Sequence, residues 1–338
     1  MRHFSQDDGA GTLAPGYAEV AQLVEHTTEN RGVAGSIPAL GTSLPYARLP
    51  RDRMGDRMSR ILVVNAQPGA GATAVAAGLG RLIALEGRGL RFVRLAGDAR
   101  AEADARAFAS FEIADASGAP VAEGDVPADD QNVTIIEAPG GADGASLAQK
   151  LGAKLVVVTT DATLTQDGAT VIANHQRHAG PHAIAEDRLL AAPTVAQLIE
   201  ASGATVLSRS EAGDAAICEH LVVGAISHDA ADAYFGRFPR RAVVSRVEKV
   251  DLALAAMLTR SECLILTGGH EPSPYLLDRA ASTRETTLLL APEGTVETMR
   301  DIEGTFGKSA FSHEAKLERM STLLAAALEP SALAALAG

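Results

Sequence analysis

The sequence predicts an α/β protein built from two parallel-sheet domains, and three observations support this fold class. Short apolar runs recur along the chain, and most are separated by stretches of helical composition. A glycine-rich turn follows the first run, from Gln67 to Gly71. A glycine pair, Gly268-Gly269, follows a later apolar run. Because such alternation is typical of parallel sheets covered on both faces, we expect one domain over 58–185, a second over 186–328 and a tail over 329–338.

The first domain is expected to hold four regular strands and two helices. Apolar runs place the strands, and Gly87 and Gly89 end the first helix. Residues 161–170 are too few for a regular crossover helix before the apolar run at 171–174, so we expect the first sheet to be truncated there. The expected strands are 61–64, 90–95, 133–136 and 155–158, the expected helices are 74–86 and 99–111, and an acidic loop is expected at 118–131.

The second domain repeats the alternation of strands and helices. This regularity indicates a second, smaller parallel sheet. An Ala- and Leu-rich helix near 314–328 is expected to close the domain. The expected strands are 221–227, 242–247, 263–266 and 287–290, and the other expected helices are 195–202, 229–238, 250–258, 272–281 and 295–306.

The composition argues against several classes of function. The net charge of −12 disfavours broad contact with nucleic-acid phosphates or anionic membranes. No apolar run is long enough to cross a bilayer. Aromatic residues make up 4% of the chain and tryptophan is absent, which disfavours a base-stacking surface. Cys218 and Cys263 each lead into an apolar run, so we expect buried, reduced thiols and a cytoplasmic protein.

Residues 1–57 show no sustained helical or strand period and are expected to be non-globular. The stretch 20–26, VAQLVEH, back-translates to GTA GCT CAG CTG GTA GAG CAC, which resembles the D-arm of a transfer RNA gene. The stretch 35–38, GSIP, back-translates to GGT TCG ATT CCC, which resembles a T-arm. We interpret this segment as a start codon assigned too early, with Met58, or alternatively Met54, as the start. The alternative is a genuine disordered arm.

The turn between the first strand and the first helix carries the clearest chemical signal. A buried strand, a glycine turn and a helix N-terminus in succession leave backbone N–H groups unpaired, and these groups favour an anion. The stretch resembles a P-loop, in which Gly69, Gly71 and Thr73 would bind the nucleotide. Where a P-loop carries a lysine before this threonine, the chain has Ala72. We therefore expect a phosphate cradle that lacks the charge needed for catalysis.

An acidic residue and a glycine pair end a later strand, at Glu137 and Gly140-Gly141. A P-loop on the first strand followed by this pattern resembles the dethiobiotin synthetase family of P-loop proteins. The resemblance implies ATP or another nucleotide held with Mg²⁺, for which Glu137 and the Thr73 hydroxyl are the candidate metal ligands. The alternative is that Glu137 only ends a strand at an exposed edge. The family builds base recognition from the region of a later strand that ends in asparagine, here Asn174.

Three histidines, His175, His178 and His182, fall within one short segment. Spaced histidines are one signature of a metal site. Pro181 breaks any helix that would align all three, and no cysteine lies near them. A solvated loop is therefore the favoured interpretation.

The second domain resembles a DRTGG domain, although Ser245-Arg246-Val247-Glu248 stands where the name-giving residues are expected. Thr267, Gly268 and Gly269 end a parallel strand, which is where open α/β sheets bind ligands. We take these three residues as the candidate ligand turn of the second domain, with a plain strand-to-loop turn as the alternative. The resemblance is carried by 223–227 (VGAIS), 251–256 (DLALAA), 263–269 (CLILTGG) and 272–274 (PSP).

The order of the two domains, joined by a connector at 189–195, resembles the N-terminal part of long bacterial phosphate acetyltransferases. The resemblance covers about 58–320. In those enzymes a further C-terminal domain transfers the acetyl group, and no such domain is expected here. The resemblance also implies a regulatory role for the second domain and a possible homodimer.

Two functions are compatible with these observations. The first is a regulatory protein that binds a nucleotide or another small phosphorylated metabolite and acts on an acyl-phosphate-metabolising enzyme. Ala72 favours this function, and no catalytic residue is assigned. The alternative is an ATP-dependent ligase of the dethiobiotin synthetase type, with Asp98 or Asp104 serving the substrate. Ala72 opposes the alternative, because phosphoryl transfer needs positioned cations.

Overall fold

The computed structural model describes residues 59–338 except 129–130, 225–230 and 310. The expectations for 1–57 and for the two candidate starts, Met54 and Met58, lie outside the described residues. So do the last residues of the strand expected at 221–227 and the first of the helix expected at 229–238. Within the described part of the chain, two α/β sheets confirm the predicted fold class.

The first sheet has seven strands in the order β3-β2-β4-β1-β5-β6-β7, and every named pair is parallel. Apolar residues fill the central strands, which are buried on both faces, as expected for a parallel sheet under helices. The carboxyl ends of β1, β2 and β4 therefore meet at one edge. The strands are β1 Arg60–Asn65, β2 Leu90–Arg94, β3 Asp115–Ala116, β4 Val133–Glu137, β5 Lys154–Thr159, β6 Ala169–Gln176 and β7 Ala183–Ala185.

The sheet was expected to be truncated after the fourth strand, and this expectation is wrong. Residues 169–176 form β6, which runs parallel to β5 with Leu155 opposite Ala169. The link over 160–168 contains no helix. The sheet thus continues through a direct loop, which the usual helical crossover rule does not anticipate.

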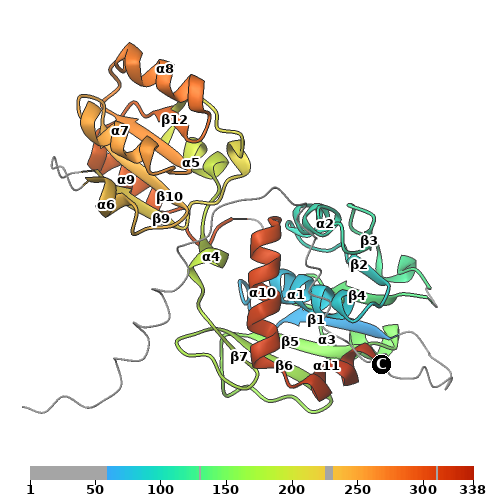
Figure 1. The fold of residues 1–338 in the computed structure, drawn as a ribbon. Helices are drawn as coiled ribbons and strands as arrows, with labels where there is room; N and C mark the ends of the chain where they lie inside the picture. The colour runs from blue at the N-terminus through green and yellow to red at the C-terminus, as the bar shows by residue number, and fades with distance from the viewer. Residues whose placement is uncertain (1–58, 129–130, 225–230, 310) are drawn as a thin grey trace, which may run out of the picture. The chain divides into compact units, whose positions relative to one another are not determined.

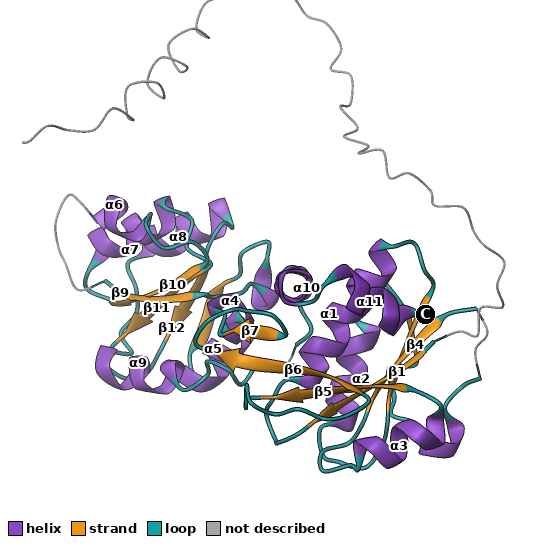
Figure 2. Cartoon of the chain, turned by 90° about the horizontal axis from the view of Figure 1, so that it is seen from below, coloured by secondary structure: helices purple, strands orange, loops and turns teal. Residues whose placement is uncertain are grey.

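Helices cover the two faces of the first sheet unequally. Figure 2 shows α1 (Ala72–Leu85), α10 (Glu314–Ala327) and α11 (Pro330–Ala337) on one face and α3 (Gly144–Leu151) on the other. The first face also receives α2 (Ala101–Ala109), whose Phe108 stacks on Phe92 of β2 at 4.7 Å between ring centroids. The larger core therefore lies on the α1 face.

The helix at 314–327 packs on the first sheet, whereas we expected it to close the second domain. Leu317, Met320 and Leu324 of α10 are fully buried in the same core as α1 and β1. A Cβ on Gly78 of α1 would lie 2.6 Å from Leu324 Cδ1, so this glycine permits the close approach of the two helices. The chain thus returns to the first sheet after the second sheet is complete (Figure 1).

The second sheet has five strands in the order β8-β12-β11-β10-β9. Neighbours from β9 to β12 are parallel, and β8 is an antiparallel edge that the sequence did not reveal. The strands are β8 Thr205–Ser208, β9 His220–Val223, β10 Arg241–Arg246, β11 Cys263–Thr267 and β12 Thr287–Leu290.

Both faces of the second sheet are covered by helices (Figure 2). One core packs under α6, α7 and α8, and the other packs under α5 and α9. The two cysteines, Cys218 and Cys263, are free thiols buried in the second of these cores. These helices are α5 Val195–Ser202, α6 Ala231–Phe235, α7 Val250–Leu258, α8 Pro274–Thr283 and α9 Thr295–Glu303. The short helix α4, Arg188–Ala191, precedes them, and its Leu189 belongs to a separate small cluster.

Among the described helices, none is by itself long and apolar enough to span a membrane. The pair α10 and α11 reaches the required length and composition only when taken together, and its members are bent by 113°. Their apolar residues belong to the core of the first sheet.

Candidate functional site

The turn between β1 and α1 has the backbone shape of an anion cradle. Gly69 and Gly71 have φ values of 80° and 96°, which other L-residues rarely adopt. Ala72 begins α1 with its side chain only 1% exposed, within the core. The Ala72 methyl group is therefore packed in the core.

Several amide groups of this turn are without a hydrogen bond to any residue that the structure describes. They are the N–H groups of Gly69, Gly71, Thr73 and Ala74. The N–H of Ala72 is different, because it donates to Asn65 Oδ1 at 2.9 Å. The first turn of a helix leaves such donors unpaired, and they attract an anion.

Residues at the end of β6 lie against the same turn. Asn174 is buried and donates from Nδ2 to the Ala70 carbonyl at 2.9 Å. The Asn174 side chain therefore holds the turn by a hydrogen bond. The exposed His175 has a φ of 56°, and its Nε2 lies 3.7 Å from the position that a Cβ on Gly71 would take. Its ring has no hydrogen bond to the described residues. The sequence placed His175 in a solvated loop and gave no indication that it lies beside this turn.

Thr73 and Glu137, predicted from separate motifs, meet at the edge of the sheet. The Thr73 hydroxyl donates to Glu137 Oε1 at 2.7 Å. Glu137 ends β4 with 1% of its surface exposed, so the alternative of a carboxylate at an exposed edge is wrong. Its other oxygen, Oε2, is buried without a hydrogen bond to the described residues.

Arg94, at the end of β2, is the guanidinium that faces this carboxyl group. Its Nε lies 3.6 Å from Glu137 Oε2, an ion-pair distance too long for a hydrogen bond. Its Nη2 donates to both oxygens of Asp98 at 2.9 and 2.7 Å, and its Nε lies 3.4 Å from Asp104. Arg94 is only 3% exposed, so its guanidinium faces three carboxyl groups and is shielded from solvent.

The pKa shifts show how charge is distributed in this cluster. Burial raises the pKa of Glu137 to about 8, and Arg94 opposes the rise without cancelling it. Burial likewise raises the pKa of Asp104 against the pull of Arg94. For Asp98, burial is outweighed by hydrogen bonds from Arg94 and from the Gly140 N–H, and its pKa is lowered. At neutral pH a protonated Glu137 thus leaves Arg94 facing two further carboxyl groups, and the cluster has no cation to spare for a ligand.

These groups fit Mg²⁺ poorly. A carboxyl group that is protonated near neutral pH and faces a guanidinium is a weak ligand for a divalent cation. No group of three or more His, Cys, Asp or Glu residues in the described part of the chain is arranged to hold a metal ion, and this includes the three histidines of the segment 175–182. A magnesium ion at Thr73 and Glu137 stays a prediction from resemblance.

In the second sheet, the predicted ligand turn at Thr267, Gly268 and Gly269 forms hydrogen bonds with neighbouring residues of the chain. The two glycines have φ values of 101° and 65°. Their N–H groups donate to the carbonyls of Glu293 at 2.8 Å and Ala291 at 3.2 Å. The Thr267 hydroxyl is buried and lies 2.8 Å from that of Thr295. The turn therefore joins β11 to the loop after β12, and its amides are engaged.

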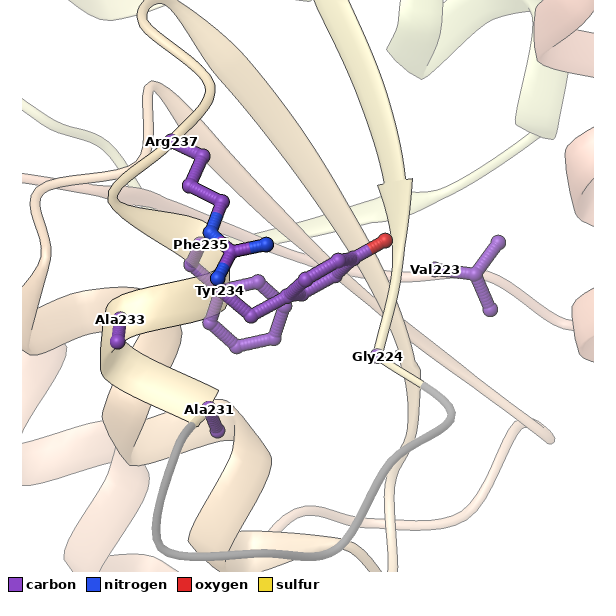
Figure 3. A pocket seen from close by; sticks show the side chains of 7 residues that line it. All are labelled: Val223, Gly224, Ala231, Ala233, Tyr234, Phe235 and Arg237. Atoms are coloured by element: carbon purple, nitrogen blue, oxygen red, sulfur yellow. The ribbon is translucent and has the colours of Figure 1, made fainter. Parts of the chain in front are cut away.

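A cavity of about 200 Å³ lies instead at the carboxyl end of β9. Figure 3 shows the side chains of Tyr234, Phe235 and Arg237 projecting from α6 and the turn after it, opposite the end of β9. The walls are mostly apolar, and among the described residues their polar side-chain groups are the Tyr234 hydroxyl and the Arg237 guanidinium. The other lining residues are Val223, Gly224, Ala231 and Ala233.

Sequence reasoning missed Arg94 and the cavity. Arg94 carried one weak signal, because a charged residue ends an apolar strand in the register of Glu137 on the neighbouring strand. No sequence motif marked the cavity, because its lining residues are of common types that lie in a short helix and at the end of a strand. Asp98 and Asp104, considered only as substrate ligands, serve as partners of Arg94.

Comparison with known proteins identifies a DRTGG domain at residues 197–305. Among solved structures, the chain is similar to the CBS and DRTGG domains of the regulatory region of Clostridium perfringens pyrophosphatase, complexed with the activator diadenosine tetraphosphate. The identity is 17% and the TM-score 0.30, over 36% of this chain and 52% of that one. The match thus spans about half of the other chain, and a likeness this low carries no argument about ligand or mechanism.

Proposed function

We propose that this is a regulatory protein that binds a nucleotide or another small phosphorylated metabolite at the turn 67–73 and does not transfer its phosphoryl group. One observation carries the proposal: the turn has unbonded backbone N–H groups, but no lysine or arginine side chain of the described residues is available beside them. Gly69, Gly71, Thr73 and Ala74 offer unbonded N–H groups. Ala72 is buried in the core, and Arg94 is held by carboxyl groups.

The electrostatics of the turn support binding without catalysis. Backbone amides and a helix dipole hold a phosphate oxygen at modest strength. Phosphoryl transfer needs, in addition, cations that neutralise charge as it develops. His175 lies beside Gly71 and is free to contact a bound anion, but a single exposed imidazole does not replace a lysine at position 72.

The finer parts of the proposal come from resemblance. The DRTGG domain supports a regulatory role. The order of the two domains supports a relation to the non-catalytic N-terminal part of phosphate acetyltransferases, and hence an acyl-phosphate-metabolising partner. The Cys218 and Cys263 thiols are compatible with a reducing compartment.

The test uses the full-length chain and isothermal titration calorimetry with ATP, acetyl phosphate and inorganic phosphate, each with and without Mg²⁺. We expect at least one of them to bind, and we expect binding to be lost in Gly71→Ala, whose Cβ would lie 2.5 Å from Asn174 Nδ2. Gly124→Ala is the matched control, because its Cβ would meet no atom within 4 Å. If none of the three ligands binds, or if both variants bind equally well, the proposed site is wrong.

A further inference from the structure

We propose that the cavity between β9 and α6 is a second binding site, which takes a mononucleotide with its base inside the cavity and its phosphate on Arg237. This site belongs to the DRTGG domain and is independent of the turn 67–73. It also replaces the turn at 267–269 as the place where the second sheet meets a ligand.

The size of the cavity sets the class of ligand. A volume of about 200 Å³ has room for roughly six water molecules at about 30 Å³ each. A single purine or pyrimidine ring system fills such a space, whereas a dinucleotide or a coenzyme A moiety does not fit inside it. Anything attached to the ring must lie at the mouth of the cavity.

The walls of the cavity suit a flat apolar ring. Phe235 is fully buried, and the ring of Tyr234 contacts those of Phe235 and Phe238, at 5.8 and 5.5 Å between centroids. Two neighbouring aromatic side chains therefore brace the ring of Tyr234. A braced aromatic ring is a good stacking partner for a base, because little side-chain entropy is lost on binding. The Tyr234 hydroxyl has no hydrogen bond to a described residue and is free to bond a ring nitrogen.

Arg237 supplies the charge. It is exposed at the cavity, and its guanidinium makes no ion pair or hydrogen bond with the described residues. Some other arginines of this domain are paired, among them Arg240 with Glu219 at 2.9 Å and Arg209 with Asp214 at 3.0 Å. A free guanidinium at the rim of an apolar cavity favours phosphate, which it binds through two parallel hydrogen bonds.

The backbone at the cavity floor is held in place. The Gly224 N–H donates to the Val244 carbonyl at 2.7 Å, which extends the pairing of β9 with β10. A Cβ at Gly224 would lie 3.2 Å from both side-chain atoms of Ser245 and 3.5 Å from Phe235. The absence of a side chain here lets β9 approach β10 and keeps this end of the cavity open.

The test measures AMP binding by full-length protein in isothermal titration calorimetry, with adenosine and ribose 5-phosphate as the two halves of the ligand. We expect AMP to bind at least 10-fold more tightly than either half. Arg237→Gln should weaken AMP about 10-fold or more and leave adenosine unchanged. Tyr234→Leu should weaken AMP and adenosine alike, and Tyr234→Phe should keep most of the affinity.

Two matched controls separate this site from the rest of the surface. Tyr275→Leu removes a tyrosine that is 60% exposed on α8, and Arg300→Gln removes an exposed arginine of α9. Neither variant should change AMP binding. Because Arg237 is exposed, its variant should fold even if Tyr234→Leu does not.

Three results would overturn the inference. AMP fails to bind, or Arg237→Gln binds AMP as the wild type does, or AMP binding is lost in Gly71→Ala while it survives in Arg237→Gln. The last result would assign the nucleotide to the turn 67–73 and support the proposed function alone. Conversely, binding that depends on Arg237 and not on Gly71 supports this inference even if the turn binds nothing.

Discussion

Glu137 should make the protein less stable as pH rises, and Glu137→Gln should remove this dependence. The carboxyl group is buried at the end of β4, with Oε1 accepting from Thr73 and Oε2 unbonded. Burial raises its pKa from about 4.5 to about 8. The folded protein therefore holds a proton over this interval that the unfolded chain has released.

The sign and size of the effect follow from proton linkage. A group with a raised pKa in the folded state contributes stability that is fully present below the unfolded value and is lost as pH rises through the folded value. The loss is about 1.4 kcal/mol per pH unit between the two pKa values. Between pH 5 and 8 the wild type should therefore lose on the order of 4 kcal/mol through Glu137, whereas glutamine has no charge to bury.

The assay is urea unfolding of the full-length protein, followed by far-UV circular dichroism at pH 5, 6, 7 and 8. Glu137→Gln should be close to the wild type at pH 5 and increasingly more stable toward pH 8. Glu86→Gln, which removes an exposed carboxylate after the end of α1, should follow the wild type. Parallel profiles for the wild type and Glu137→Gln would refute the reasoning, as would a similar gain from Glu86→Gln.

Three further predictions concern particular positions. Gly71→Ala should lower stability by about 2 kcal/mol, because φ is 96° and the new Cβ would meet Asn174, whereas Gly124→Ala should be nearly neutral in thermal melts. Leu324→Ala should cost about 2–5 kcal/mol in urea unfolding, since the side chain is fully buried against α1, and no loss would contradict that packing. Burial lowers the pKa of Lys316 from 10.5 to about 8, so its contribution to stability should rise between these pH values, and Lys316→Met should abolish the rise in thermal melts.

The sequence predicted the sheets well because buried parallel strands are continuous apolar runs. The runs at 61–64, 133–136 and 155–158 fall within β1, β4 and β5, and the run at 263–266 falls within β11. The short edge strands β7 and β8 were missed, because three or four residues with partial burial leave little pattern.

The sequence did not show which sheet the helix 314–327 covers. Its apolar residues mark a buried face but carry no information about the partner. Gly78 permits this packing, because its missing side chain makes room for Met320 and Leu324. Small residues that permit a close approach are recognisable only once both helices are placed.

The shape of the turn was predictable where backbone geometry depends on residue type. Gly69 and Gly71 have positive φ values, and Thr73 donates a hydrogen bond to Glu137. Binding of a nucleotide or a metal by these residues stays a prediction. The charge balance was not predictable, because Arg94 at the end of β2 also faces Glu137, which ends a different strand and lies far along the chain. A local sequence pattern does not contain such long-range electrostatics.

The most direct test of the central claim is a single ³¹P NMR experiment on the full-length protein with Mg²⁺ and ATP or acetyl phosphate in separate samples. The account predicts that the wild type broadens or shifts a phosphate resonance of at least one ligand, that Gly71→Ala does not, and that the ligand remains intact over hours. Magnesium-dependent appearance of ADP from ATP would contradict the account, because it would mean that the turn transfers the phosphoryl group that we propose it only binds.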